Sequence, residues 1–228
     1  MTITLAFDVY GTLIDTAGIT TALTEHLGHR AAEFSRLWRE KQLEYSFRRG
    51  LMQNYRDFSV CTKNALDYAC LYFRTEITPS DKQDLMDQYR MLPPFSDVEE
   101  GLSKLKSSVF RLFAFSNGRA QDVSSLLKNA NIHHYFEGVI SVDEIRSFKP
   151  NPAVYGHFLR QSETVGSATW LISSNPFDVI GAISAGISAV WIKRSAEAIF
   201  DPWEIKPTVT VNRLTELYEA LSGADKHP

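Results

Sequence analysis

Short apolar runs alternate with helical stretches over most of this chain, and this alternation is the feature that most restricts its fold. Most of the runs are rich in β-branched and aromatic residues, as strands buried on both faces of a sheet are. The runs are Ile3–Phe7, Phe110–Phe115, Val139–Ser141, Thr169–Ile172, Ala189–Ile192 and Val209–Val211. Helical stretches such as Ala120–Ala130 and Pro152–Gln161 separate many of them. This order predicts an α/β fold with a parallel, doubly wound sheet.

One long segment interrupts the alternation. From Ile19 to Met91 the sequence contains amphipathic helical patterns and no strand pattern. The simplest topology is a helical cap that is inserted after the first strand and covers the carboxyl edge of the sheet. The predicted domain boundaries are therefore residues 16–92 for the cap, and residues 1–15 together with 93–228 for the core.

Composition narrows the classes of partner. A net charge of -3 and a pI near 6.1 argue against nucleic acid or an anionic membrane as the main partner. We expect neither a signal peptide nor a membrane span, because no apolar run approaches the roughly 18 residues that a span needs. The two cysteines, Cys61 and Cys70, lie in one helical stretch, where they are poorly placed for a disulfide and too few for a metal cluster. We therefore expect a reducing, cytoplasmic compartment.

Polar side chains follow three of the predicted strands. Asp8 follows the first strand, the segment SNG begins at Ser116 after the second, and the segment SSN begins at Ser173 after the fourth. Asp8 alone could equally cap the turn after it. In a parallel sheet, however, all three strand ends share one edge, where open α/β sheets bind their ligands. Lys149 precedes a proline, so it lies outside a helix and can reach the same edge. The combination favours a ligand site over a set of caps.

Four motifs carry a family resemblance. In this order and spacing, FDVYGTL, FSNG, SFKPNPAVY and SSNPFD resemble the motifs of the haloacid dehalogenase superfamily. Within the predicted cap, LWREKQLEYSF resembles the arginine-bearing helix of the L-2-haloacid dehalogenases. The resemblance extends from Ile3 to about Leu217. It implies a Rossmann-like core with a cap of the four-helix-bundle type. It also implies hydrolysis of short L-2-haloalkanoic acids to D-2-hydroxy acids through an aspartyl ester.

Two departures distinguish this chain from the phosphatases of the superfamily. Tyr10 stands where the phosphatases have a second aspartate, and serines of SSNPFD stand where they supply carboxylates to magnesium, leaving Asp178 as the acid of that motif. Magnesium prefers oxygen ligands, and a phosphoryl dianion beside Asp8 would be repelled without it. A 2-haloacid carries one negative charge, which one cationic side chain and a few donors can offset. We therefore expect neither metal nor cofactor.

Two other functions fit the chain less well. One is a phosphatase of the same superfamily that acts on a small phosphoester, against which Tyr10 and the serines count. The other is a non-catalytic binding protein, which would have no reason to keep Asp8, Lys149 and Arg39 together. Release of halide or phosphate, measured with and without magnesium, separates the three functions.

The resemblance assigns the chemical steps to a small set of polar residues. Asp8 is the nucleophile that attacks C2 of the substrate in line with the departing halide. Thr12 orients Asp8, and Lys149 keeps Asp8 ionised through its opposite charge. Arg39 cradles the leaving halide. The other predicted catalytic residues are Ser116, Tyr155, Ser173, Asn175 and Asp178.

The same resemblance predicts how water and substrate are held. Asp178, with Ser173 and Asn175, would place and polarise the water that hydrolyses the ester. Ser116 and Asn117 would bind the substrate carboxylate and help to receive the halide. The predicted substrate- and halide-binding residues are Tyr10, Arg39, Leu43, Phe58, Ser116, Asn117 and Phe177.

Several of these residues also have simpler structural explanations. The alternative for Thr12 is a turn residue after Gly11, and the alternative for Asp178 is a helix cap. The alternative for Lys149 and Arg39 is a position in solvent. The residues that could belong to the core alone are Leu43, Phe58, Tyr155 and Phe177.

The implied partners are a small 2-haloacid and a halide ion. Homodimers are frequent in the family, and the predicted cap carries aromatic residues at Tyr68, Tyr72 and Phe73 that suit either an interface or a core. Glu40 departs from the uncharged residue that the family has beside Arg39. It either alters the substrate preference or points to solvent.

Overall fold

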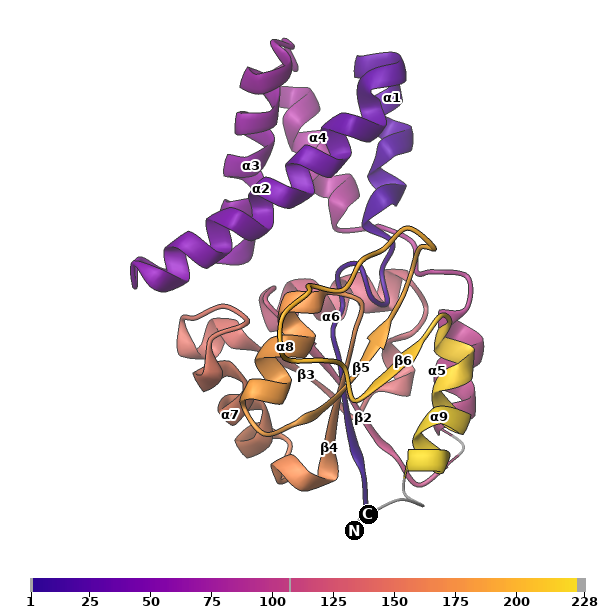
Figure 1. Ribbon diagram of the computed structural model, residues 1–228. Coiled ribbons are helices and arrows are strands. Elements are labelled where there is room, and N and C mark those ends of the chain that lie inside the picture. Colours follow the sequence, from indigo (N-terminus) through magenta and orange to yellow (C-terminus); the bar gives the residue numbers. More distant parts are fainter. Residues whose placement is uncertain (1, 107, 225–228) are drawn as a thin grey trace.

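The computed structural model describes residues 2–106 and 108–224 of the chain, and these residues form a parallel six-stranded sheet under a set of helices (Figure 1). All neighbouring strands are parallel, in the order β3-β2-β1-β4-β5-β6. The strands are β1 (Thr4–Phe7), β2 (Arg111–Ser116), β3 (Gly138–Ser141), β4 (Thr169–Ser173), β5 (Ser188–Ile192) and β6 (Val209–Val211). The predicted α/β sheet is confirmed, and each predicted strand begins and ends within one residue of the observed one.

The strand order changes direction between β1 and β4. From β1 the chain builds β2 and β3 on one side of the sheet, and β4, β5 and β6 on the other. Phe7 pairs with Ala114 of β2 and Ile172 of β4, so the carboxyl ends of these three strands lie side by side. Such a switch point opens a crevice at the sheet edge, and Asp8 enters it with its N–H bonded to the Ile172 carbonyl at 3.0 Å.

Helices cover both faces of the sheet. Alternate residues of each strand point to opposite faces, so Phe7 packs on one side and Ala6 on the other. The Phe7 face is covered by α5 (Val98–Lys106), α6 (Ala120–Asn129) and α9 (Leu217–Ala224). The Ala6 face is covered by α7 (Pro152–Gln161) and α8 (Pro176–Ser184). The crevice therefore has a rigid, doubly packed sheet beneath it.

Four α-helices between β1 and α5 stand above the carboxyl edge of the sheet (Figure 1). They are α1 (Thr20–Leu27), α2 (Ala31–Leu51), α3 (Phe58–Phe73) and α4 (Pro79–Tyr89). The chain leaves and returns through two adjacent segments: the Asp15 N–H donates to the Pro93 carbonyl at 2.9 Å, and the Phe95 N–H donates to the Leu13 carbonyl at 3.0 Å. The helices thus connect to the sheet at one place.

Two further expectations concern single features of these helices. Cys61 and Cys70 both lie in α3, where both are free and buried. None of the helices formed by the described residues combines the length and the apolar character needed to cross a membrane.

Candidate active site

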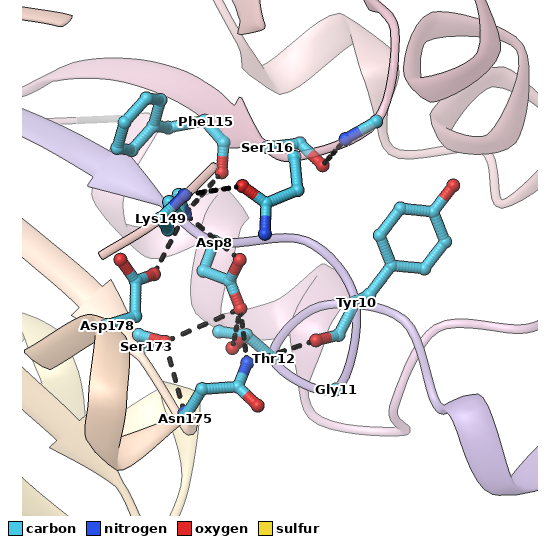
Figure 2. A network of polar contacts seen from close by, with 12 residues as sticks. Asp8, Tyr10, Gly11, Thr12, Phe115, Ser116, Lys149, Ser173, Asn175 and Asp178 are labelled. Carbon is cyan, nitrogen blue, oxygen red and sulfur yellow. Dashed lines mark hydrogen bonds and ion pairs between the residues drawn. The ribbon is translucent and has the colours of Figure 1, made fainter. Parts of the chain in front are cut away.

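The carboxylate of Asp8 is surrounded by donors (Figure 2). Its Oδ2 atom accepts hydrogen bonds from Thr12 Oγ1 at 2.8 Å and from Asn175 Nδ2 at 2.7 Å, with Ser173 Oγ at 3.4 Å. Its Oδ1 atom lies 3.1 Å from Lys149 Nζ. All these donors are side chains. Within the described part of the chain Asp8 therefore does not cap the turn after it, and the alternative of a simple cap is wrong.

The loop after Asp8 is shaped to turn Thr12 back towards it. Gly11 has a φ of 84°, a conformation that favours glycine. The Ser174 N–H donates to Thr12 Oγ1 at 2.9 Å, and Ser174 Oγ donates to the Gly11 carbonyl at 2.6 Å. Thr12 is thus more than a turn residue. Ser174 was not among the predicted site residues, although its place directly after a strand was a usable signal.

Lys149 is buried beneath the site, with a relative exposure of 1%. It lies in a turn, and its Nζ atom donates to the Phe115 carbonyl at 2.9 Å and to Asp178 Oδ2 at 2.8 Å, in addition to Asp8. Its backbone N–H donates to Asn117 Oδ1 at 2.9 Å. Burial alone would lower the pKa of Lys149, but the carboxylates of Asp178 and Asp8 outweigh it and raise the pKa above its ordinary value. The solvent-exposed alternative is wrong, and the ammonium group stays charged.

Asp178 is fully buried on the other side of Lys149. Tyr155 donates its hydroxyl to Asp178 Oδ1 at 2.8 Å, so the ring of Tyr155 carries a polar link as well as a core contact. Burial raises the pKa of Asp178, Lys149 opposes the rise, and the charge of Asp8 adds to it. The cap position of α8 belongs to Asn175, so the helix-cap alternative for Asp178 is wrong.

The polar residues at the carboxyl ends of β2 and β4 have different hydrogen-bond partners. Ser116 Oγ accepts the Gly118 N–H at 3.1 Å, and Asn117 holds the Lys149 backbone. The side chains of Ser173 and Asn175 bond to Asp8 and not to the Asp178 carboxylate. All four predicted residues lie at the sheet edge, but only Ser173 and Asn175 are linked to Asp8, whereas Ser116 and Asn117 bond to Gly118 and Lys149.

Arg39 reaches the site from the four helices α1–α4 above the sheet edge, which are called the cap from here on. The half-buried side chain lies on α2, where Nη2 donates to the Tyr10 carbonyl at 3.1 Å and Nη1 to Gln42 Oε1 at 2.6 Å. Asn175 Nδ2 donates to the same Tyr10 carbonyl at 3.2 Å, so Arg39 and Asp8 share a neighbour. The solvated position is therefore wrong for Arg39. The neighbouring Glu40 does point to solvent, with its side chain 58% exposed.

Gln42 supports Arg39 and was not predicted. It is buried, donates to Thr62 Oγ1 at 2.5 Å, and accepts the Tyr89 hydroxyl at 3.1 Å with the oxygen that also binds Arg39. Because the bonds of the buried Gln42 amide all stay within α2–α4, Gln42 fixes the direction of the Arg39 guanidinium. Its position three residues after Arg39, one turn along a helix, was the available signal.

Apolar side chains line the space between α2 and the sheet edge. Arg39, Leu43 and Phe47 follow one another at intervals of four residues and so share one face of α2. The half-buried Phe47 ring meets the Phe177 ring edge-on, with centroids 5.0 Å apart. Phe47, Phe177 and Lys149 are among the residues that line a groove of about 470 Å³. Phe177 is therefore part of the contact between cap and sheet.

Tyr10 joins the site through its backbone rather than its hydroxyl. Its ring is directed away from Asp8 in Figure 2 and packs against Phe58, at 5.7 Å, and Tyr89, at 6.0 Å between centroids. Burial raises the pKa of the Tyr10 phenol. Phe58 in turn packs against Phe148, at 6.3 Å, beside Lys149. Tyr10 and Phe58 thus connect the cap to the wall of the site.

The donor set around Asp8 does not fit magnesium. Asn175 Nδ2 donates to both Asp8 and the Tyr10 carbonyl, and N–H groups cannot ligate a cation. Lys149 already stands between Asp8 and Asp178 as the local positive charge. In the part of the chain that the structure describes, no group of three or more His, Cys, Asp or Glu side chains could hold a metal ion.

Comparison with known proteins relates this chain to named enzymes. It is 33% identical over 220 residues, 96% of each chain, to (S)-2-haloacid dehalogenase 2 of Pseudomonas sp. (strain CBS-3). It is 35% identical to haloacetate dehalogenase H-2 of Moraxella sp. (strain B), covering 91% of this chain and 92% of the relative. The predicted resemblance to the L-2-haloacid dehalogenases is confirmed.

Solved structures and a family pattern agree with these relatives. L-2-haloacid dehalogenase from Xanthobacter autotrophicus with chloropropionic acid covalently bound superposes with a TM-score of 0.89 at 28% identity, covering 98% of this chain and 99% of that chain. The family described as haloacid dehalogenase-like hydrolase matches residues 5–192. This chain belongs to the haloacid dehalogenase-like hydrolase family.

Proposed function

We propose that this chain is an (S)-2-haloacid dehalogenase, which hydrolyses short L-2-haloalkanoic acids to D-2-hydroxy acids. The observation that carries the proposal is the Asp8 carboxylate, held by side-chain donors and the buried Lys149, with the Arg39 guanidinium bonded to the same loop. Relatives at about one-third identity over nearly the whole chain have this name. The proposal makes the chain a hydrolase acting on carbon–halogen bonds.

In the first step, Asp8 attacks C2 of the haloacid. A carboxylate oxygen forms a bond to C2 while the carbon–halogen bond breaks, and the halide leaves with the electron pair. Lys149 places a positive charge 3.1 Å from Asp8 Oδ1, since its raised pKa leaves the ammonium group charged at neutral pH. Arg39 and the donors at Ser116 and Asn117 receive the halide and the substrate carboxylate. In-line attack inverts C2.

In the second step, water cleaves the aspartyl ester at the carboxyl carbon of Asp8. Asp178 accepts the water proton, and its raised pKa makes it a better base near neutral pH than an exposed carboxylate. Thr12, Ser173 and Asn175 already donate to Asp8 Oδ2 or lie beside it, so they can stabilise the charge that develops on that oxygen. The bond between the Asp8 carboxyl carbon and the substrate oxygen then breaks, the 2-hydroxy acid leaves with the second proton of the water, and the proton on Asp178 passes to solvent. This returns the Asp8 carboxylate and leaves the configuration of C2 unchanged.

The substrate is held without a metal or another cofactor. Tyr155 orients Asp178 through its hydroxyl. Apolar contacts to the carbon chain come from residues between the cap and the sheet edge. These residues are Tyr10, Leu43, Phe58 and Phe177.

The test is a single turnover in water enriched in heavy oxygen, with L-2-chloropropanoate and excess enzyme. The first product molecule should carry an unlabelled oxygen from Asp8 and should have the D configuration. Activity should survive EDTA. The variant Asp8→Asn should release no halide, whereas Asp87→Asn, on the cap surface, should behave as the wild type.

Label in the first product, retention at C2, or activity that depends on magnesium would contradict the proposal. Release of phosphate from small phosphoesters would favour a phosphatase, and release of neither ion a binding protein.

We further propose that residues 16–92 form a cap domain and that residues 1–15 and 93–228 form the core. The single connection through Leu13–Asp15 and Pro93–Phe95 supports this division, which includes residues 1, 107 and 225–228 outside the described part of the chain.

A homodimer is also proposed, through the exposed side of α3. Leu71 and Tyr72 are 79% and 62% exposed there, and the Tyr68 ring stacks on Tyr72 with centroids 6.4 Å apart. Phe73, by contrast, is buried in the cap core and does not belong to this surface. Sedimentation of the full chain measures the oligomeric state.

The free, buried cysteines support a reducing compartment, for which we propose the cytoplasm.

A further inference from the structure

Arg194 lies at the same sheet edge as Asp8 and has no part in the steps above. It follows β5, and its side chain is only 13% exposed. The guanidinium donates twice to the Thr12 carbonyl, from Nη2 at 2.6 Å and from Nε at 3.2 Å. Nη1 donates to both carboxylate oxygens of Asp97 at 2.7 and 2.8 Å. Its planar fork thus bridges the loop of Asp8 and a buried acid.

Thr12 is the residue that carries this contact to Asp8. Its hydroxyl donates to Asp8 Oδ2 at 2.8 Å, while its carbonyl accepts the two bonds from Arg194. Among the described residues, no other donor to the Thr12 carbonyl is found. One end of Thr12 is therefore held by Arg194, and the other end holds the nucleophile.

Asp97 gives Arg194 a fixed anchor. It is 4% exposed and also accepts the Leu214 N–H at 2.6 Å. Phe95, two residues earlier, lies under the guanidinium with its ring centroid 4.3 Å away. The Phe95 N–H donates to the Leu13 carbonyl, next to Thr12. The anchor, the returning segment of the cap and the nucleophile loop form one connected unit.

We propose that Arg194 is a positioning residue: by holding the Thr12 carbonyl against Asp97, it fixes the direction in which Thr12 presents Asp8 for attack. This inference rests on the proposed function, since it concerns the orientation of the nucleophile. Arg194 does not touch the substrate. Its loss should therefore lower kcat with little change in KM.

The first test is Arg194→Met, with Arg111→Met as a matched control. Arg111 makes the same kinds of bond at the start of β2, to the Ser162 carbonyl at 2.7 Å and to Glu137 at 3.0 Å. Misplacing a catalytic group by about 1 Å can lower its rate by roughly a hundredfold, so we expect a 10- to 100-fold lower kcat for Arg194→Met. The control should keep the wild-type kcat. Equal values in both variants would overturn the proposal.

A double-mutant cycle tests whether the effect passes through Thr12. Thr12→Val removes the hydroxyl and keeps the shape of the side chain. If Arg194 acts by aiming that hydroxyl, Arg194→Met should lower kcat much less in the Thr12→Val background than in the wild type. If Arg194→Met lowers kcat by the same factor in the Thr12→Val background as in the wild type, Arg194 acts by another route, and the proposal is contradicted.

Hydrogen exchange supplies a readout that does not depend on turnover. Arg194→Met should speed amide exchange in residues 9–14, and Arg111→Met should not. Should the methionine variant fail to fold, Arg194→Lys keeps a charge beside Asp97 but lacks the fork, and it should show the same changes to a smaller degree. Unchanged exchange in residues 9–14 would refute the inference. A wild-type enzyme that releases no halide would refute the proposed function alone, because exchange still decides the role of Arg194.

Discussion

The protonation of Asp178 is governed by neighbours that oppose one another. Burial raises its pKa, the positive charge of Lys149 lowers it, the negative charge of Asp8 raises it, and the hydrogen bond from Tyr155 lowers it. As a base, Asp178 has to be ionised, so kcat should fall as the pH falls through this raised pKa.

The pKa of Asp178 in the folded protein also lies above its pKa in the unfolded chain. Asp178 therefore stabilises the fold most at low pH, and this contribution is lost as the pH rises from about 3.8 through the folded pKa.

Tyr155→Phe should move the acid limb of the kcat profile to higher pH. The variant removes a hydrogen bond that favours the charged carboxylate of Asp178. A bond to a charged group contributes about 1.5 kcal/mol or more, which corresponds to a shift of roughly one pH unit. Tyr218→Phe, on the exposed face of α9, is the control and should leave the profile in place. A limb that stays or moves to lower pH in Tyr155→Phe would contradict the assignment of Asp178 as the base.

The positions of strand ends predicted several site residues from the sequence. The other site residues could not be predicted, because they depend on contacts between distant parts of the chain. Asp8 directly follows β1 and Ser173 is the last residue of β4, and the parallel sheet brings Ser173 Oγ to 3.4 Å from Asp8 Oδ2. Arg194 also follows a strand, but its inward direction depends on Asp97, 97 residues away in the chain. Gln42 depends in the same way on Thr62 of a different helix. Spacing along one segment cannot reveal a partner that only tertiary packing supplies.

At the scale of secondary-structure elements, the close packing of α7 against α8 holds the two buried charges, Lys149 and Asp178, in place. Gly181 allows this approach: a Cβ added there would lie 2.4 Å from the Tyr155 hydroxyl oxygen and 2.6 Å from Pro150 Cβ. Tyr155 holds Asp178, and Pro150 directly follows Lys149. The two helices therefore set the positions of both buried charges. The sequence predicted a helix at Pro152–Gln161, but it could not show that this glycine is a contact point.

Gly181→Ala should therefore reduce both stability and turnover. Forcing one extra methyl group into a packed core costs about 1–3 kcal/mol, and the relief of this clash would displace Tyr155 or Pro150. Gly156→Ala is the matched control, since its Cβ would lie 3.4 Å from the flexible end of Arg160, and alanine favours a helix by about 0.5–1 kcal/mol. Urea unfolding and halide release measure the two effects. A Gly181→Ala protein as stable and active as Gly156→Ala would show that α7 and α8 can separate without consequence.

At the scale of the whole molecule, the cap meets the sheet through a few distinct contacts. Arg39 bonds to the Tyr10 carbonyl, and Phe47 packs on Phe177. The Tyr55 hydroxyl donates to Asp143, which follows β3. The alternation of strands and helices predicted the core and the helical insertion. It could not predict these contacts, because each joins a residue of the cap to one beyond the end of a strand that is at least 29 residues away in the chain.

Tyr55→Phe tests whether this polar contact helps to hold the cap over the site. Phenylalanine keeps the ring contact with Phe148, at 5.0 Å between centroids, and removes only the bond to Asp143. A hydrogen bond of this kind contributes about 1 kcal/mol, so weakening the closed arrangement should raise KM by up to about fivefold, with kcat changed less than twofold. Tyr45→Phe, whose ring meets Tyr68 within the cap, should leave KM unchanged. A fall in kcat without a change in KM would place the contribution of Tyr55 in the chemical step, and the cap would then be held by its apolar contacts and Arg39 alone.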